Sequence, residues 1–264
     1  MSGLNHRPRK RFGQNFLIDQ HIINDILSAI APHSGDNLVE IGPGRGALTA
    51  PLLTQCPTLK MIELDRDLVT ALQTKFAHYP HCQILQSDAL KFDFSTLFAA
   101  SQPLRIVGNL PYNISTPLIF HLLSYVDHIA DMHFMLQKEV VDRLAARPGN
   151  KHYGRLSVAV QYRCRVDALV AVPPHAFAPA PKVESAFVRL TPLRPMPFSA
   201  NDPALLRRLV NTCFQQRRKT LRNSLKLLVS TELAETLDVD LKARPETLSV
   251  ADFVKLSNQL SCLL

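Results

Sequence analysis

Short apolar runs alternate with amphipathic stretches along most of the chain. Apolar runs bounded by turn-forming residues are typical of buried strands, and apolar positions three and four residues apart are typical of helices. A helix that Thr116 can cap is expected to begin with Pro117. The other expected helices cover residues 21–31 and 138–144, with a helical pattern through Leu52 and Leu53. Strands are expected at residues 38–41, 60–62, 83–86, 104–107, 132–136, 156–161, 168–172 and 185–190. This alternation predicts an α/β fold built on a doubly wound sheet.

The pattern changes after a proline-rich run at Pro192, Pro195 and Pro197, which we interpret as a linker. Beyond this run the periodicity is purely helical. The sequence therefore predicts two domains, residues 1–193 and residues 194–264. Within the first domain, residues 1–20 are expected to form a flexible basic arm or lid.

The tail carries a basic helical face. Residues 205–228 form one amphipathic pattern in which, at about 100° per residue, apolar positions lie on one side and basic positions on another. A face of this kind suits docking on RNA phosphates better than reading of bases. The residues that we expect to make these contacts are Arg218, Lys219, Arg222 and Lys226.

The net charge of +8 is concentrated in two segments. Residues 1–20 contain four Arg or Lys against Asp19, and residues 194–226 contain eight against Asp202. Two basic segments on a nearly neutral body indicate a polyanionic partner, nucleic acid rather than a membrane. The alternative is a charged surface that only keeps the protein in solution.

Composition is that of an ordinary globular protein, with 264 residues of which 46% are hydrophobic. No apolar run reaches the ~18 residues of a membrane helix, and the basic, polar start contains no hydrophobic signal segment. The five cysteines are scattered, with no zinc-binding spacing. Reduced thiols, no metal and a cytoplasmic location are therefore expected.

A glycine-rich turn, EIGPGRGA at residues 40–47, follows the strand expected at residues 38–41. Its glycines fit both the GxGxxG/A pattern of dinucleotide sites and the E-x-GxGxG pattern of S-adenosylmethionine sites. Glu40 would repel a pyrophosphate but could help to hold a cationic amino-acid group, and Pro43 lacks an N–H that a phosphate would use. These features favour S-adenosylmethionine, with a nicotinamide dinucleotide as the alternative. Glu63 lies 21 positions after Gly42, where an acidic side chain can reach two ribose hydroxyls.

The strand at residues 104–107 leads into the sequence NLPYNISTP, which begins at Asn109. The Asn109 amide oxygen and the Leu110 carbonyl offer two acceptors for an amine, and Tyr112 offers a flat face on which a base can stack. Two acceptors beside an aromatic ring predict a pocket for an aromatic exocyclic amine. The alternative is a plain strand-to-helix turn with a buried tyrosine.

Other candidate ligand-binding side chains have equally simple structural explanations. Asp88 can accept from an adenine amine or cap the next turn. Phe177 can provide a second stacking face or lie buried under the proline-rich loop 177–183. The basic and aromatic residues of segment 10–19 can form a ligand lid or a plain arm.

Over nearly its whole length the chain resembles the small-subunit ribosomal RNA adenine dimethyltransferases of the KsgA/RsmA type. The resemblance rests on the order and spacing of KRFGQNFLID, VEIGPGRGALT, IELDRDL, SDAL, NLPYNISTPLIFHLL, QKEVVDRLAARPG, FAPAPKVESAFVRL and FQQRRKTLRNSLK. It implies a Rossmann-like class I methyltransferase domain with a small all-helical C-terminal domain. It also implies two adjacent adenosines in the 3′-terminal hairpin loop of small-subunit rRNA as substrate, modified by a monomer on the immature 30S particle in late ribosome biogenesis.

The resemblance also implies roles for individual residues. Catalysis would involve Asn109, Leu110, Tyr112 and Phe177. Hydrogen bonds from the adenine amine to the Asn109 side chain and the Leu110 carbonyl would favour a pyramidal nitrogen, which attacks the sulfonium methyl in line. Tyr112 and Phe177 would stack on the base. The residues implied in holding S-adenosylmethionine are Asn15, Leu17, Gly42, Glu63, Asp88 and Asn109.

Three alternatives remain at this stage. The first is an Erm-type enzyme that dimethylates one adenosine of large-subunit rRNA; Leu110 in the NLPY tetrapeptide and the long basic tail favour the KsgA/RsmA type. The second is an RNA-binding assembly or transcription factor that keeps the fold without activity, against which Gly42, Glu63, Asp88 and Asn109 argue. The third is a nicotinamide dehydrogenase.

Overall fold

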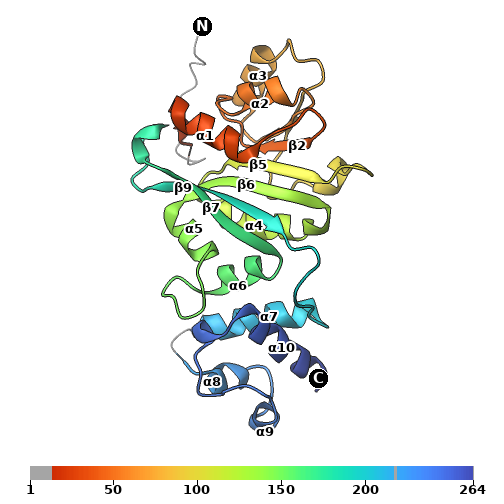
Figure 1. Ribbon diagram of the computed structural model, residues 1–264, viewed down its shortest axis with the longest axis vertical. Helices are drawn as coiled ribbons and strands as arrows, with labels where there is room; N and C mark the ends of the chain where they lie inside the picture. The colour runs from red at the N-terminus through yellow and green to blue at the C-terminus, as the bar shows by residue number, and fades with distance from the viewer. Residues whose placement is uncertain (1–13, 217–218, 264) are drawn as a thin grey trace. The chain divides into compact units, whose positions relative to one another are not determined.

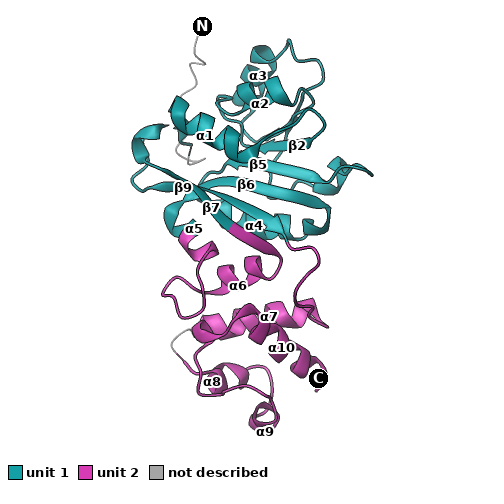
Figure 2. Cartoon of the chain, in the orientation of Figure 1, with its two compact units in different colours: residues 1–141, 167–192 teal, residues 142–166, 193–264 magenta. Residues whose placement is uncertain are grey.

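The computed structural model describes residues 14–216 and 219–263, and the chain divides into two compact units (Figure 1). The first unit runs to Val141 and also contains Asp167–Pro192, and the second contains Asp142–Val166 and Leu193–Leu264 (Figure 2). Residues 142–166, expected from the sequence to belong to the first domain, pack with the tail in the structure. No helix in the described ranges combines the length and apolar character needed to cross a bilayer.

A seven-stranded sheet, in the order β4-β3-β2-β5-β6-β9-β7, forms the centre of the first unit. Strands β4, β3, β2, β5 and β6 run parallel, and β9 pairs antiparallel with β6. A separate two-stranded pair joins Phe16–Leu17 (β1) to Phe177–Ala178 (β8). The strands of the large sheet are β2 (Asn37–Ile41), β3 (Lys60–Glu63), β4 (Gln83–Gln86), β5 (Leu104–Asn109), β6 (Ile129–Gln137), β7 (Cys164–Val172) and β9 (Ser185–Pro192).

The strand order reverses between β2 and β5. The chain runs outward from β2 through β3 to β4, and then returns to place β5 on the other side of β2. The two strands come close at their carboxyl ends, where a Cβ added to Gly108 would lie 2.6 Å from the carbonyl oxygen of Ile41. Ligands of open α/β sheets bind in the crevice at such a switch point, so the fold places the candidate site there.

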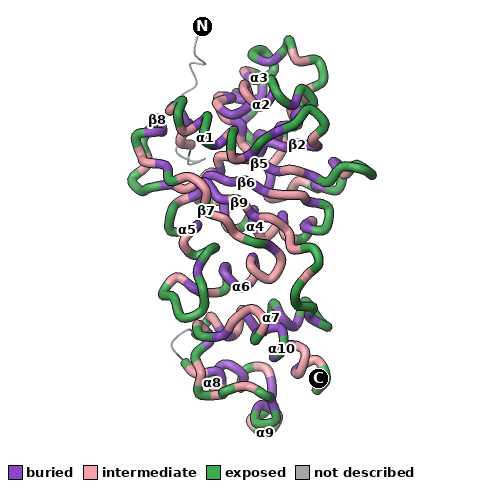
Figure 3. The backbone as a smooth tube through the Cα atoms, in the orientation of Figure 1, coloured by how far each residue is buried: buried purple, intermediate pink, exposed green. Residues whose placement is uncertain are grey.

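Apolar faces of helices cover the sheet and bury its strands, of which β5 and β6 are buried over most of their length (Figure 3). Ile26 of α1, Leu52 of α2 and Leu72 of α3 lie in one core cluster with Met61 of β3 and Val107 of β5. Helix α1 begins where the Asp19 carboxylate accepts from two backbone N–H groups. The helices of this unit are α1 (Gln20–Ile30), α2 (Thr49–Gln55), α3 (Arg66–Lys75), α4 (Ser115–Leu123) and α5 (Lys138–Leu144), the last ending three residues into the second unit.

The start of α4 differs from the sequence prediction. Ile114 is the N-cap residue and makes no side-chain capping bond, so Thr116 lies inside the helix and Pro117 is its third residue. The preceding turn is closed instead by the Ile114 N–H, which donates to the Pro111 carbonyl at 3.1 Å. The tetrapeptide thus forms its own turn between β5 and α4.

The strand expected at residues 156–161 is wrong, because Arg155–Gln161 forms helix α6. Alternating Leu156, Val158 and Val160 suggest a strand, but Ser157 between them is also fully buried. The Ser157 hydroxyl donates to the Arg143 carbonyl at 2.5 Å and accepts from the Gly154 N–H at 3.1 Å. Tertiary contacts of this kind override a weak local pattern.

The second unit is helical around its own core, which includes Tyr153, Leu209, Leu221, Phe253 and Leu260. Its helices besides α6 are α7 (Pro203–Gln215), α8 (Leu221–Leu225), α9 (Thr231–Glu235) and α10 (Val250–Ser261).

The single helix predicted over residues 205–228 is wrong. Helix α7 ends at Gln215, and Thr220 has extended backbone where α8 begins. The first two N–H groups of α8, on Leu221 and Arg222, donate to the carbonyls of Ala243 and Leu241 instead of continuing α7. The helical projection that placed four basic residues on one face therefore does not apply.

Candidate active site

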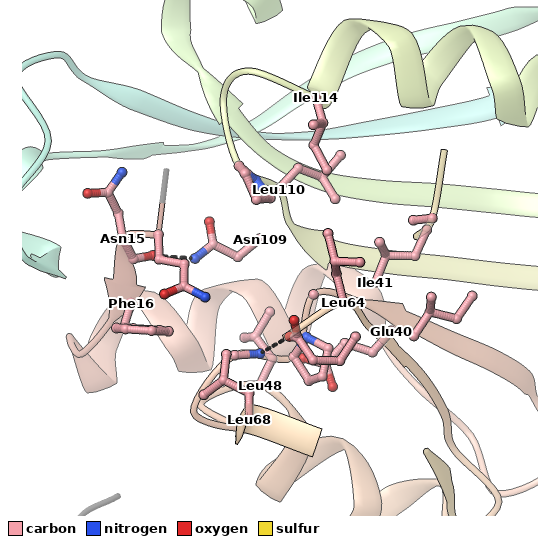
Figure 4. A pocket seen from close by; sticks show the side chains of 18 of the residues that line it. Asn15, Phe16, Glu40, Ile41, Leu48, Leu64, Leu68, Asn109, Leu110 and Ile114 are labelled. Carbon is pink, nitrogen blue, oxygen red and sulfur yellow. Dashed lines mark hydrogen bonds between the residues drawn. The ribbon is translucent and has the colours of Figure 1, made fainter. Parts of the chain in front are cut away.

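A cleft of about 310 Å³ opens at the carboxyl ends of β2, β3, β4 and β5, wholly within the first unit (Figure 4). Ligand clefts of small molecules are typically this large or larger. The cleft of this protein brings together predicted site residues from five separate segments of the chain. These are Asn15, Leu17, Gly42, Glu63, Asp88, Asn109, Leu110 and Tyr112.

Phe177 is not among the residues that line this cleft. Its side chain is 3% exposed, and it lies in the first unit's core cluster. Its backbone pairs with Leu17 in the β1–β8 ladder. In this structure Phe177 supports the strand that carries Leu17, and it offers no ring face to the cleft.

The glycine-rich turn after β2 has the backbone that its sequence requires. Gly42 has φ of +68° and Gly44 has φ of +58°, a region that L side chains rarely adopt. The Gly42 N–H donates to the Ile62 carbonyl at 2.9 Å, which ties the turn to β3. A Cβ on Gly44 would lie 3.1 Å from the Phe16 ring, and the Arg45 guanidinium lies 4.5 Å from the same ring's centre. Phe16 thus packs against this turn, a contact that the sequence did not indicate.

Glu63 ends β3 with a carboxylate that the backbone orients. One oxygen accepts from the Gly44 N–H at 3.3 Å, and the other accepts from the Asp65 N–H at 2.9 Å. Burial raises the pKa of Glu63, and these backbone hydrogen bonds oppose the rise. Each oxygen has a further lone pair, so the carboxylate can accept two hydroxyl groups in addition.

Glu40 occupies the end of β2 and is 2% exposed. Its carboxylate accepts a hydrogen bond from the hydroxyl of Thr49, the first residue of α2, at 2.6 Å. Burial raises the pKa of Glu40 to about 7; the neighbouring Glu63 adds to the rise, and Thr49 and Lys75 oppose it. The ionised form of this carboxyl group is therefore disfavoured in the folded protein.

We expect Glu40→Gln to stabilise the fold at pH 8. Because folding raises the pKa of Glu40 above its ordinary value of 4.5, the native state binds more protons than the unfolded state between pH 4.5 and about 7. The resulting penalty is absent below pH 4.5 and complete above pH 7, where it amounts to at most about 3 kcal/mol. Glutamine keeps an acceptor for Thr49 and carries no charge. Urea unfolding at pH 5 and pH 8 checks this; a variant less stable than wild type at pH 8 would contradict it.

Asn109 ends β5, and a hydrogen bond fixes the orientation of its amide. Its Nδ2 donates to the Asn15 carbonyl at 3.0 Å, so the two residues are in direct contact in the lining of the cleft (Figure 4). The amide oxygen therefore points away from that carbonyl and is held as an acceptor. The next residue, Leu110, donates its N–H to the Met135 carbonyl at 3.3 Å and buries its side chain. A single turn thus combines an oriented acceptor with a fixed backbone.

Tyr112 is half-buried at the mouth of the same turn. Its hydroxyl hydrogen-bonds to the hydroxyl of Ser185, the first residue of β9, at 2.7 Å. Burial raises the pKa of Tyr112. Nothing in the sequence connects two residues 73 positions apart, so the contact between Ser185 and a residue of the cleft could not be predicted.

Asp88 caps a turn, which is one of the two interpretations offered from the sequence. One carboxylate oxygen accepts from the Leu90 N–H at 3.0 Å, which closes the turn after β4. The residue also lines the cleft. Its turn-forming bond orients the side chain without using all of its acceptor capacity.

Similarity to known proteins identifies the family of this chain. A family model described as "Ribosomal RNA adenine dimethylase" matches residues 5–261. The chain belongs to this family. A relative from Saccharophagus degradans, "Ribosomal RNA small subunit methyltransferase A", is 62% identical over 97% of this chain and 95% of its own length. A protein of the same name from Pseudomonas aeruginosa is 58% identical over 97% of this chain and 96% of its own length.

Solved structures show the same fold. The dimethyladenosine transferase of Plasmodium falciparum superposes with a TM-score of 0.78 at 27% identity, over 91% of this chain and 95% of its own. The 23S rRNA methyltransferase ErmE superposes with a TM-score of 0.72 at 22% identity, over 94% of this chain and all of its own. The predicted class I methyltransferase fold is confirmed.

The basic tail residues lie in the second unit. Lys219 and Lys226 are exposed, and Arg222 forms a 2.7 Å ion pair with Glu235. Arg218 lies outside the described residues. Among the described residues, no group of three or more His, Cys, Asp or Glu side chains is placed to hold a metal ion.

Proposed function

We propose that this ribosomal RNA adenine dimethylase transfers methyl groups to the exocyclic amines of two adjacent adenosines in small-subunit rRNA. The methyl donor is S-adenosylmethionine, and the substrate is the immature small ribosomal particle. The reaction takes place in the cytoplasm, where these particles mature, and the protein acts as a monomer.

The observation that carries this proposal is the turn from Asn109 to Tyr112. An adenine amine is a poor nucleophile because its lone pair is delocalised into the ring. The oriented Asn109 oxygen and the Leu110 carbonyl would accept hydrogen bonds from its two N–H groups and favour a pyramidal nitrogen with a free lone pair. As positive charge develops on that nitrogen, fixed acceptors beside it stabilise the transition state. The Tyr112 ring would hold the base outside its own helical stack.

The remaining cleft residues fit S-adenosylmethionine, which supplies an electrophilic methyl group on a sulfonium. Glu63 would bind the ribose hydroxyls with the lone pairs that its backbone contacts leave available. Asp88 would accept from the adenine amine, and the glycine turn would let the ligand approach the backbone closely. Asn15 and Leu17 would close the side formed by β1. Glu40 would offset the cationic charge of the methionine portion.

Similarity to named relatives favours the small subunit over the large one. The relatives at 62% and 58% identity carry a small-subunit name, whereas the large-subunit enzyme ErmE shares 22% identity and shows the fold alone. Over nearly equal chain lengths, such a difference in identity separates substrate classes more strongly than fold does.

A methyl-transfer assay tests the proposal. Purified protein is mixed with labelled S-adenosylmethionine and either unmethylated small-subunit particles or large-subunit particles. We expect label only on the small-subunit rRNA. Label on large-subunit rRNA would support the Erm-type alternative, no transfer would support a non-catalytic RNA-binding factor, and thermal protection by NAD instead of S-adenosylmethionine would support a dehydrogenase.

We also propose that the basic residues of the tail, Arg218, Lys219, Arg222 and Lys226, contact rRNA phosphates. The structure allows a sharp test, since Lys219 and Lys226 are exposed. In Lys219→Ala/Lys226→Ala, the slope of log affinity against log salt for small-subunit particles should flatten by roughly one unit per lost contact. Filter binding at several salt concentrations measures this slope.

The matched control is the pair Arg66→Ala/Lys91→Ala, which changes exposed residues of the first unit and should alter the slope less. Equal slopes for the tail pair and wild type would indicate a face that only aids solubility.

A further inference from the structure

The Tyr112 ring is held at both ends. At one end its backbone belongs to the tetrapeptide turn, where the Ser115 hydroxyl donates to the Tyr112 carbonyl at 3.1 Å. At the other end its hydroxyl meets the Ser185 hydroxyl at 2.7 Å. A phenol ring on a loop can swing about its first side-chain torsion, and an anchor at its para position restricts that swing and fixes the direction of the ring axis.

Ser185 is well suited to be this anchor. Its side chain is 1% exposed, and it begins β9, where it is paired with Gln137 of β6 in the antiparallel ladder. The residue before it, Glu184, accepts from the Lys138 N–H at 3.0 Å. Because β6 and β9 lie in the interior of the sheet, the hydroxyl of Ser185 has a fixed position relative to β5 and its terminal Asn109.

We infer that Ser185 is a positioning residue for the methyl-accepting base: by holding the Tyr112 hydroxyl, it fixes the position and axis of the ring on which the base stacks beside Asn109 and Leu110. This inference rests on the proposed function and extends it to a residue outside the cleft lining. The amine must meet its acceptors and the methyl group at once, and a displacement of about 1 Å can cost about 100-fold in rate. A tyrosine with its hydroxyl anchored meets that requirement, whereas a ring free to tilt does not.

Removing the Ser185 hydroxyl should therefore slow chemistry and leave cofactor binding unchanged. For Ser185→Ala we expect single-turnover methylation of small-subunit particles to fall roughly 10- to 100-fold, with an unchanged Kd for S-adenosylmethionine by calorimetry. Ser185→Thr keeps the hydroxyl and should recover most of the rate. The control is Thr191→Val on the same strand, whose buried hydroxyl has no hydrogen-bond partner among the described residues and whose loss should not change the rate.

A double-mutant cycle with Tyr112→Phe decides whether the effect passes through the tyrosine. If it does, Ser185→Ala should cost little further rate in the Tyr112→Phe background. The Tyr112 ring-carbon NMR signal, assigned through Tyr112→Phe, should also shift in Ser185→Ala. Equal losses in both backgrounds, or an unshifted signal, would overturn the inference and leave the proposed function intact. Absence of transfer by the wild-type protein would instead overturn the proposed function, and the inference with it.

Discussion

Asn109→Ala should reduce the single-turnover rate of methyl transfer by roughly 100- to 1000-fold, the usual effect of losing one preorganised transition-state contact. In the structure the Asn109 amide is oriented by its bond to the Asn15 carbonyl, so its oxygen requires no reorganisation as charge develops on the amine. An acceptor of this kind gains strength mainly in the transition state, so binding of the rRNA particle should change far less than the rate.

Rapid-quench transfer under single-turnover conditions, with particle affinity measured in parallel, separates the two effects. Asn24→Ala makes the same substitution on the exposed face of α1 and should leave both quantities unchanged. If Asn109→Ala lost particle affinity while keeping its single-turnover rate, Asn109 would be a binding residue and the acceptor mechanism would be wrong.

Glu63→Ala should weaken binding of S-adenosylmethionine by roughly 5- to 150-fold, which corresponds to the 1–3 kcal/mol of a lost buried hydrogen-bonded group. The carboxylate is oriented by the N–H groups of Gly44 and Asp65, and the substitution removes the acceptor for both ribose hydroxyls. It also leaves the Gly44 N–H without this acceptor, so some loosening of the glycine turn adds to the effect.

Titration calorimetry measures this affinity, with thermal unfolding to establish that the variant is folded. Glu139→Ala removes an exposed carboxylate from α5 and should leave the affinity unchanged. Equal affinities for wild type and Glu63→Ala would exclude the ribose-binding role assigned to Glu63.

The sequence predicted the parts of the site that local patterns determine. Each strand end is marked by a short apolar run followed by a glycine, an acid or the tetrapeptide, so Gly42, Glu63, Asp88 and Asn109 were found one by one. That they line one cleft follows from parallel strands whose carboxyl ends meet at one edge of the sheet.

Features that depend on distant contacts could not be predicted in this way. The Asn15–Asn109 and Tyr112–Ser185 bonds join residues 94 and 73 positions apart. Residues 156–161 alternate like a strand, yet buried bonds of Ser157 select a helix. The sequence pattern over residues 205–228 is continuous, but the helix is not. It is broken where the backbone N–H groups of Leu221 and Arg222 donate to carbonyls at positions 243 and 241. The family resemblance implied stacking for Phe177, but in the structure its side chain is buried in the first unit's core and its backbone pairs with β1.

The most direct test of the account is to map methyl groups on the rRNA itself. Small-subunit particles from cells that lack the protein are incubated with purified protein and S-adenosylmethionine, and the digested rRNA is analysed by mass spectrometry. The account predicts two adjacent adenosines near the 3′ end, each carrying two methyl groups on its exocyclic nitrogen. Methylation of a single adenosine, of another base or of large-subunit rRNA alone would contradict it.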